Sequence, residues 1–170
     1  MKTLERKDLD WIERAPVSFS GSVTTTASPQ AVFTILADHE RWPDWFPLLK
    51  KEEVLGPRRE GVGIRRVATF PGAKIEELFI AWDPGQRLAF TATAVSPRIV
   101  RALIDDCRIE PAHSGIRVTY TTYLEPVSVF RQLMRLIKGP MGKQLDKAMG
   151  AVAAPRRGAL NGLRSGRGAD

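Results

Sequence analysis

The sequence LADHERWPDWFP at residues 36–47 places three large aromatic side chains and two prolines directly after an amphipathic helical segment. Proline favours ending a helix or fixing a turn, and the two tryptophans beside the prolines need an apolar environment. We therefore expect a short aromatic turn at one end of the fold. Two interpretations remain open: a plug that closes the hydrophobic core, or a pocket wall made by Trp42, Trp45 and Phe46.

The segments on either side of this turn follow different periodicities. Before it, residues 17–26 have the β-branched composition of a strand, and Ser28-Pro29 is typical of the start of a helix, which is expected to end near Asp38. After it, short connections between successive strands predict an antiparallel meander. Its six strands, separated by glycine- and proline-containing turns, are predicted at residues 48–55, 62–70, 73–82, 87–95, 100–110 and 115–125.

The C-terminal segment returns to helical spacing, with one apolar stripe before Gly139-Pro140 and another after it. Because proline lacks the N–H that a helix interior uses, we expect the first stripe to stop here and the main helix to begin near Pro140. Pro155 is expected to kink or end this helix. The first stripe is Phe130, Leu133, Met134 and Ile137, and the second is Met141, Leu145, Met149 and Val152, which Leu160 and Leu163 would extend.

Together these elements predict an α+β fold, with a curved seven-stranded antiparallel sheet around a long C-terminal helix. An amphipathic helix laid across a curved sheet leaves a space that commonly holds a ligand. The chain is expected to comprise an N-terminal arm at residues 1–15, a ligand-binding domain at residues 16–163 and a disordered tail at residues 164–170.

Length and composition fit a single globular domain of 170 residues, 43% of them hydrophobic. The longest apolar runs are too short to span a membrane, and the charged N-terminal sequence shows no secretory signal. The single cysteine, Cys107, excludes an intramolecular disulfide and provides no zinc-binding spacing. We therefore expect a cytoplasmic protein.

The net charge of +7 is unevenly distributed. Basic and acidic side chains balance over residues 1–127, whereas residues 128–170 hold nine basic and two acidic ones. Such an asymmetry can mark contact with a nucleic acid or an anionic membrane. The interpretation we favour is a solvated helix face and a loose tail, because no aromatic residues alternate with the last arginines to stack on bases.

Five segments, in order and at family-like spacing, resemble the START/Bet v 1-like (SRPBCC) helix-grip superfamily, in its polyketide cyclase/dehydrase and lipid transport branch. The resemblance extends over about residues 16–163 and implies a helix-grip fold. The superfamily includes carriers, receptors, cyclases and chaperone-binding proteins, so the resemblance is less specific for activity. The segments are SPQAVF at 28–33, LADHERWPDW at 36–45, VGIRRV at 62–67, ELFIAWDP at 77–84 and SGIRVTY at 114–120.

The resemblance also implies a pocket carboxylate at Glu77, beside an apolar residue at Phe79. In this sequence Cys107 stands where many members carry a tryptophan, which is expected to enlarge or reshape the pocket. Pro155 interrupts the position of the family's long helix.

Side-chain alternation along two predicted strands indicates which residues face the cavity. Glu77 and Asp105 are the expected inward acids, and Arg65 or Arg66 can approach Glu77 from the neighbouring strand. The alternative interpretation is surface charges, or a structural Arg–Glu pair that closes the sheet. The predicted inward residues are Ile75, Glu77, Phe79 and Ala81, and Leu103, Asp105, Cys107 and Ile109; the predicted outward ones are Glu76, Leu78, Ile80 and Trp82, and Asp106 and Arg108.

A carboxylate in an apolar cavity has a raised pKa and can move a proton, whereas one paired with arginine stays charged and can anchor a ligand. Glu77 and Tyr120 are accordingly the candidates for catalysis. The predicted ligand-binding set is Trp42, Trp45, Phe46, Arg65, Glu77, Phe79, Phe90, Asp105, Cys107, Tyr120, Leu145 and Met149.

Other chemistries find little support in the sequence. His39 and His113 lie in separate turns, and there is no nucleophile motif, phosphate loop or dinucleotide fingerprint. We expect no metal and no cofactor. Cys107 is interpreted as a buried small hydrophobe rather than a reactive thiol.

Three functions remain open. The first is a non-catalytic binder of a small hydrophobic molecule such as a lipid, isoprenoid or polyketide. The second is a polyketide aromatase/cyclase or dehydratase acting by acid/base catalysis in the same cavity. The third is an interaction with RNA, the ribosome or a membrane surface through the basic C-terminal segment. The sequence favours the first, and it indicates neither the ligand nor the oligomeric state.

Overall fold

The structure is a computed structural model that describes residues 1–153, apart from the side chains of Met134 and Arg135. The prediction for Pro155 and those for the basic residues and leucines that follow it lie outside this part of the chain.

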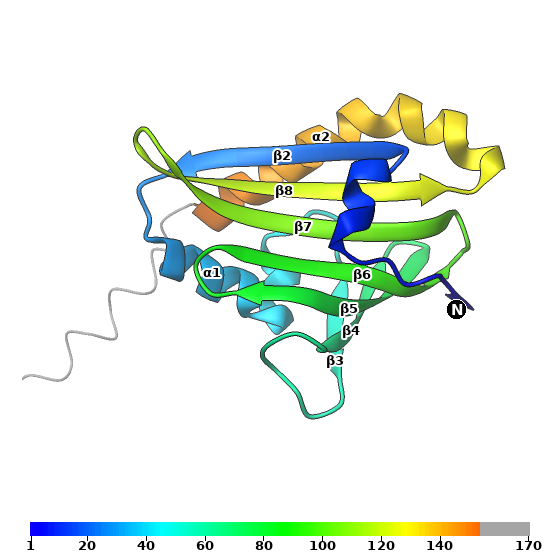
Figure 1. Cartoon of the computed structure of the whole chain (residues 1–170), viewed down its shortest axis with the longest axis horizontal. Coiled ribbons are helices and arrows are strands. Elements are labelled where there is room, and N and C mark those ends of the chain that lie inside the picture. Colours follow the sequence, from blue (N-terminus) through cyan, green and yellow to red (C-terminus); the bar gives the residue numbers. More distant parts are fainter. Residues whose placement is uncertain (154–170) are drawn as a thin grey trace, which may run out of the picture.

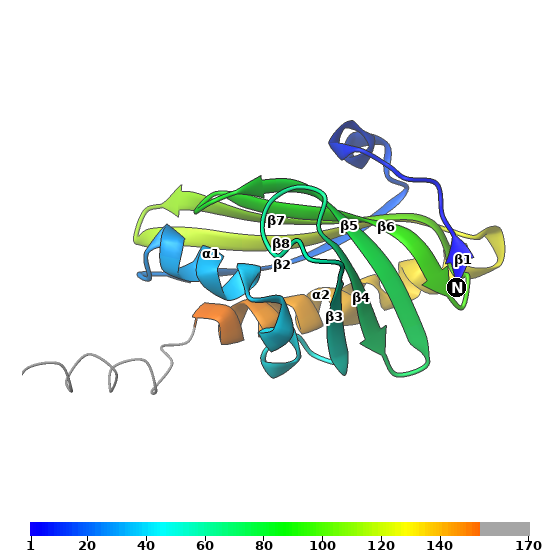
Figure 2. The same cartoon turned by 90° about the horizontal axis from the view of Figure 1, so that it is seen from below.

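One strongly curved antiparallel sheet dominates the molecule, with strand order β2-β8-β7-β6-β5-β4-β3. Figure 1 shows its outer face, and in Figure 2 β3 and β4 turn steeply away from β2, β7 and β8, so that the sheet curls over α2. The seven predicted strands and the helix are confirmed. The seven strands are β2 (Val17–Thr25), β3 (Lys51–Leu55), β4 (Arg65–Phe70), β5 (Ala73–Asp83), β6 (Arg87–Ser96), β7 (Val100–Ala112) and β8 (Gly115–Pro126).

An additional two-residue strand, β1 (Lys2–Thr3), pairs with the end of β6. β6 and β7 pair only from Arg87 to Thr91 on β6, and β1 then takes the place of β7 beside Ala94 and Val95. The arm continues through the 3-10 helix η1 (Leu9–Arg14). Its Trp11 packs on Ala102 and Ile104, on the outer face of the sheet.

The helix after β2 forms as its sequence predicts. Ser28 caps α1 (Pro29–Ala37) by accepting a hydrogen bond from the Ala31 N–H, at 3.2 Å. The aromatic turn follows as the 3-10 helix η2 (His39–Asp44). The Trp42 indole N–H donates to the Leu36 carbonyl at 2.8 Å, which ties the turn back to the end of α1.

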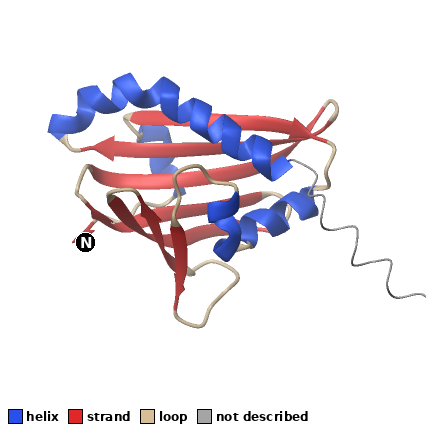
Figure 3. Cartoon of the chain, turned by 180° about the vertical axis from the view of Figure 1, so that it is seen from behind, coloured by secondary structure: helices blue, strands red, loops and turns tan. Residues whose placement is uncertain are grey.

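The C-terminal helix is longer than predicted. A short 3-10 helix, η3 (Ser128–Phe130), leads into α2 (Arg131–Ala153), and α2 continues through Pro140 rather than beginning there. A proline inside a helix removes one hydrogen bond and bends the helix, but it need not end a helix that packing holds further on. Figure 3 shows α2 changing direction along its length on the concave side of the sheet. Its C-terminal half is held by Leu145, Ala148, Met149 and Val152, all buried.

α2 crosses β2 at Gly21, where the two backbones touch. A Cβ atom at this position would overlap the Leu145 carbonyl carbon and the Asp146 backbone nitrogen. The Asp146 carboxylate also accepts a hydrogen bond from the Ser22 N–H, at 2.9 Å. Glycine is therefore needed here to set the distance between helix and sheet.

Two predicted faces at the end of β5 are wrong: Ala81 lies on the outer side with its partner Ala89, and Trp82 lies on the inner side. Trp82 lies there in edge contact with Phe33 and Phe79, whereas Ile80 packs with Trp11 on the outer side. The reason is a β-bulge, because Phe79 pairs with Phe90 and Ala81 with Ala89. The extra residue in β5 reverses the alternation beyond it.

Candidate functional site

A cavity of about 300 Å³ lies between the concave face of the sheet and α2. We call it the chamber. Its walls are aliphatic and aromatic apart from three polar side chains, those of Asp105, Thr122 and Gln144. The remaining lining residues are Phe19, Phe46, Pro47, Leu48, Phe70, Ala73, Ile75, Val95, Ile99, Val100, Leu103, Leu124, Ile137, Met141 and Leu145.

The entrance side of the chamber is marked by a residue in an unusual conformation. Leu48 lines the chamber, yet its side chain is 61% exposed, and its φ of 68° is a left-handed value that leucine rarely adopts. Across from it, Ile137 and Met141 of α2 are only partly buried. The chamber therefore meets the surface between the loop after η2 and the bend of α2.

Beyond the chamber, strands β3, β4, β5 and β7 bring together one arginine and three acids. We call Glu52, Arg66, Glu77 and Asp105 the charged cluster. The Arg66 Nε–H donates to Glu77 at 2.6 Å, and a Glu52 oxygen lies 2.7 Å from the same nitrogen. Arg66 and Glu77 face each other directly across β4 and β5, and all four side chains are buried.

Aromatic rings surround the Arg66 guanidinium. Its central carbon lies 4.0 Å from the Trp42 ring centre, 4.3 Å from that of Phe90 and 4.9 Å from that of Phe79. Ring faces attract a cation, and here they also exclude water from it. Burial acts to lower the pKa of Arg66, but Glu52 and Glu77 outweigh this effect and raise it. The arginine therefore stays positively charged.

Three carboxyl groups compete for this one cation. Burial raises the pKa of Glu77 and raises that of Glu52 to about 8, while Arg66 opposes both shifts. The Arg66 Nε–H is directed at Glu77, and within the described chain neither Glu52 oxygen has a hydrogen-bond partner. We therefore assign the ionised carboxylate to Glu77 and a proton to Glu52.

Asp105 joins the charged cluster to the chamber, because its side chain lines both the chamber and a second cavity of about 30 Å³ among the cluster residues. The second cavity is large enough for a water molecule. Burial, and then the charge of Glu77, raise the pKa of Asp105 to about 7. The Thr122 hydroxyl donates to its carboxylate at 2.5 Å and opposes this shift.

Two further side chains complete this end of the interior. Tyr120 lines the small cavity, and burial together with Asp105 and Glu77 raises its pKa well above the usual value. His39 places Nδ1 3.4 Å from an Arg66 nitrogen, and burial and then Arg66 lower its pKa to about 4. His39 is thus neutral at physiological pH and adds no charge to the cluster.

The structure brings part of the predicted ligand-binding set together and separates the rest. Phe46, Asp105 and Leu145 line the chamber, and Trp42, Glu77 and Tyr120 line the small cavity beside it. The other predicted residues lie elsewhere: Phe79, Phe90, Cys107 and Met149 are packed in the core, and Trp45 borders a surface groove beside Pro43, Lys147 and Ala151.

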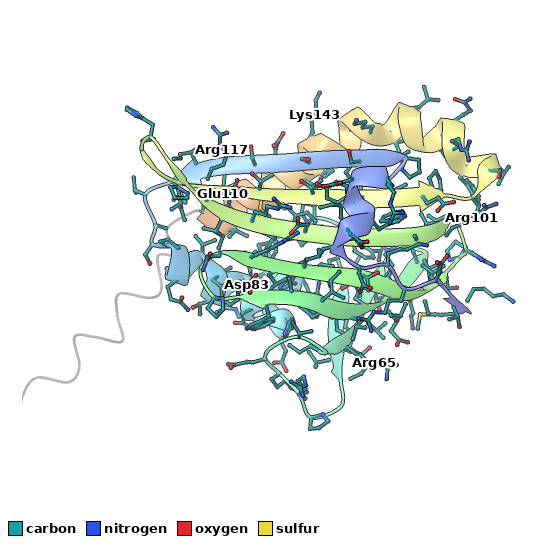
Figure 4. The ribbon with its side chains drawn as sticks, viewed as in Figure 1. Arg65, Asp83, Arg101, Glu110, Arg117 and Lys143 are labelled. Carbon is teal, nitrogen blue, oxygen red and sulfur yellow. The ribbon has the colours of Figure 1, made fainter. Side chains whose placement is uncertain are left out.

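Arg65 is not beside Glu77. It pairs with Glu76 on the outer face, and its side chain is 56% exposed. Figure 4 shows it at the outside of the molecule near β3 and β4. Arg66, the other arginine considered for this role, occupies the inner position because it is in register with Glu77.

Sequence reasoning missed Glu52, His39 and Thr122. Glu52 shares a face of β3 with the partly buried Val54, so strict alternation along that strand would have indicated it. Thr122 follows the inward-facing Tyr120 by two residues in the same way. For His39 no comparable signal exists, because its position depends on how η2 folds back on β4.

Membrane-spanning and metal-binding features are absent from the described residues. Among them no helix combines the length and apolarity needed to cross a bilayer. Nor do the same residues contain a group of three or more histidine, cysteine, aspartate or glutamate side chains that could hold a metal ion.

Comparison with known proteins agrees with this architecture. An uncharacterized protein of Mycobacterium tuberculosis and one of Mycobacterium bovis are each 34% identical over 122 residues, which is 71% of this chain and 73% of theirs. A START superfamily protein of Mycobacterium smegmatis has a TM-score of 0.65 at 15% identity, over 79% of this chain and 96% of its own.

Two further solved structures share the fold. A protein of Thermus thermophilus has a TM-score of 0.66 at 18% identity, over 81% of this chain and 94% of its own. An aromatase/cyclase from a Streptomyces species has a TM-score of 0.64 at 17% identity, over 81% and 91%. At such identities these structures show a common fold. The model of the family described as polyketide cyclase/dehydrase and lipid transport matches residues 16–155, and the chain belongs to this family.

Proposed function

We propose that this protein binds a small hydrophobic molecule, such as a lipid, isoprenoid or polyketide, in the chamber without transforming it. The observation that carries the proposal is an unfilled, almost wholly apolar space of about 300 Å³ in an otherwise packed interior. Specific ligand pockets usually span roughly 300–1,000 Å³ and combine apolar walls with a few polar groups. Asp105, Thr122 and Gln144 supply those groups here.

The contrast with the charged cluster supports binding over catalysis. Acid/base chemistry needs its proton donors and acceptors within hydrogen-bond reach of the substrate. Glu52, Glu77 and Tyr120 line the small cavity and do not line the chamber, so the reactive groups and the available space are separated. Of the side chains that the structure describes, a ligand in the chamber meets one that is titratable, Asp105.

Asp105 supports a second candidate function, that of a polyketide cyclase or dehydratase. Asp105 faces the chamber, and its pKa is raised to about 7, close to the value an acid/base catalyst uses at neutral pH. Cyclisation of a poly-β-ketone abolished by Asp105→Asn, with the fold intact, would favour this function. The third function, through the basic C-terminal segment, gains no support, because four of the nine basic residues of that segment lie outside the described residues.

Native mass spectrometry of the freshly purified protein tests the proposal, followed by extraction of any bound molecule. We expect an additional mass that organic solvent removes, and we expect a solvatochromic apolar dye to bind after extraction.

A cavity-filling variant makes the test specific. Leu103→Trp should fill part of the chamber and reduce dye binding at least tenfold. The matched control is Leu136→Trp, because Leu136 is 78% exposed on α2. This variant should bind the dye as the natural protein does. Equal dye binding by the Leu103→Trp variant and the control would exclude the chamber as the binding site.

A further inference from the structure

Most of the polar groups that reach the chamber are hydrogen-bond acceptors. Among the described residues its lining includes no lysine, arginine or histidine, and Asp105 is the one ionisable side chain there. The Thr122 hydroxyl already donates its hydrogen to Asp105, so it presents an acceptor to the chamber. Gln144 supplies the remaining amide from α2. A ligand's polar end therefore meets mainly oxygen acceptors.

The cation of the charged cluster is withdrawn from the chamber. Arg66 is 1% exposed and does not line the chamber. Its Nε–H is directed at Glu77, and the rings of Trp42 and Phe90 lie close against the guanidinium. An anionic group in the chamber would have to reach this charge through the small cavity, which Glu77 and Asp105 also line and which holds little more than a water molecule.

The charge balance works in the same direction. With Glu52 protonated and His39 neutral, the Arg66 charge is balanced by Glu77, so among the described residues an ionised Asp105 has no cation of its own. A carboxylate brought next to Asp105 would lose its hydration without gaining a counter-ion, which is strongly unfavourable in an apolar environment. An ammonium or hydroxyl group at the same place would donate a hydrogen bond to Asp105.

We propose that the chamber selects apolar molecules whose polar end is a hydrogen-bond donor, an amine above a hydroxyl, and rejects fatty acids and other apolar carboxylates. This inference rests on the proposed function and specifies its ligand class. Asp105 is the group that discriminates, and the Thr122 hydrogen bond holds its carboxylate in place.

Three probes with the same chain separate the possibilities: decylamine, decanol and decanoate, each below its micelle concentration. Calorimetric titration and thermal shift are measured at about pH 8, above the pKa of about 7 for Asp105. We expect decylamine to bind at least tenfold more tightly than decanoate, with decanol between them. Decanoate binding as tight as that of decylamine overturns this inference and leaves the proposed function standing. Failure of all three probes to bind overturns both.

Variants then test the role of Asp105 in this selection. Asp105→Asn should weaken decylamine binding at least tenfold and leave decanoate no weaker than before. The matched control is Glu110→Gln, which removes a negative charge from an exposed site on the same strand and should leave all three affinities unchanged. Unchanged decylamine binding by the Asp105→Asn variant overturns the assignment.

A second variant keeps the inference testable if Asp105→Asn does not fold. Gln144→Lys places a cation on the chamber wall at an exposed helix position, where substitution is tolerated. It should raise decanoate affinity and lower decylamine affinity. No change in the ratio of the two affinities would show that wall charge does not govern selection, and the inference would be wrong.

Discussion

The chamber and the charged cluster lie side by side under the same sheet, but they differ in available space and in charge. The chamber has space but almost no charge, whereas the cluster has four ionisable side chains and room for little more than a water molecule. The aromatic side chains explain the difference. Trp42, Phe79 and Phe90 are packed around Arg66, so mainly aliphatic residues are left to form the chamber wall.

The comparison teaches that a buried charge and a ligand site need not coincide in this fold. Arg66 and its acids are satisfied by one another, which makes them a structural unit. No described side chain fills the chamber, which is why we propose it as the ligand site. Asp105 is the only side chain of the cluster that reaches both regions. The following experiments test this division, from the largest expected effect to the smallest.

The largest effect should come from removing both acidic partners of Arg66. The double variant Glu52→Gln, Glu77→Gln leaves a buried guanidinium with no carboxylate beside Nε and should lower the free energy of unfolding by about 3–5 kcal/mol. Either single variant should cost clearly less, because the remaining acid can ionise and keep the pair. Urea denaturation at neutral pH measures the stability of the two single variants and the double variant. A double variant as stable as the single variants would show that Arg66 and its acids do not form a structural unit.

A smaller effect should come from moving α2 without touching the charged cluster. Gly21→Ala forces the helix backbone away from β2 and should cost about 2–3 kcal/mol. Its control is Gly139→Ala, because a Cβ atom at that position meets nothing within 4 Å. This substitution should stabilise the helix by about 0.5–1 kcal/mol. Chemical denaturation gives both values. Equal effects of the two substitutions would show that the close approach of α2 at Gly21 is unimportant.

The protonated state of Glu52 predicts a pH dependence. The pKa of Glu52 is about 8 in the fold against 4.5 as a reference, so between these values the folded protein holds more protons than the unfolded chain. Its free energy of unfolding should therefore fall as pH rises, and Asp105 acts in the same direction up to about pH 7. His39 acts oppositely, but only between about pH 4 and 6.5.

Above pH 6.5, the reference pKa of His39, the change of stability with pH therefore reports on the acids and not on His39. Glu52→Gln should flatten the decline in stability between pH 6.5 and about 8, whereas Glu53→Gln, at the exposed neighbouring position, should leave it unchanged. Stability measured by denaturation at several pH values decides. The same slope in both variants would mean that Glu52 is ionised in the fold.

The smallest effect belongs to Arg65, one residue from the charged cluster and on the opposite face. Its pair with Glu76 is exposed, so Arg65→Gln should change the free energy of unfolding by no more than about 0.5 kcal/mol. Thermal denaturation at low and high salt checks this value. A loss of several kcal/mol would place Arg65 in the interior.

The sequence predicted the sheet well because turns and alternation are local properties. All six strands after the aromatic turn exist, although β3 and β4 begin later than expected. Leu48 adopts a left-handed conformation before β3, and Gly61 and Gly63 have positive φ angles before β4. These local turns shorten the strands without changing their order.

What the sequence could not supply is register and packing. Alternation assigned Glu77 to the interior, but the choice between Arg65 and Arg66 required the pairing of β4 with β5. It failed for Trp82 because a bulge in β5 leaves no clear sequence signal. The sequence also predicted Phe79 and Phe90 in the pocket, because no local signal showed that their rings would pack against the guanidinium of Arg66.

The two-residue strand β1 has a consequence for the integrity of the sheet. β6 and β7 separate after Thr91, which creates a seam within the sheet rather than at its border. Lys2 and Thr3 close that seam beside Val95 and Ala94, and the Leu4 N–H donates to the Thr93 carbonyl at 2.8 Å. Without them, the backbone of β6 would present unpaired groups of the kind that recruit strands from other molecules. Residues 2–4 therefore satisfy backbone groups in the interior of the sheet that a strand from another molecule could otherwise pair with.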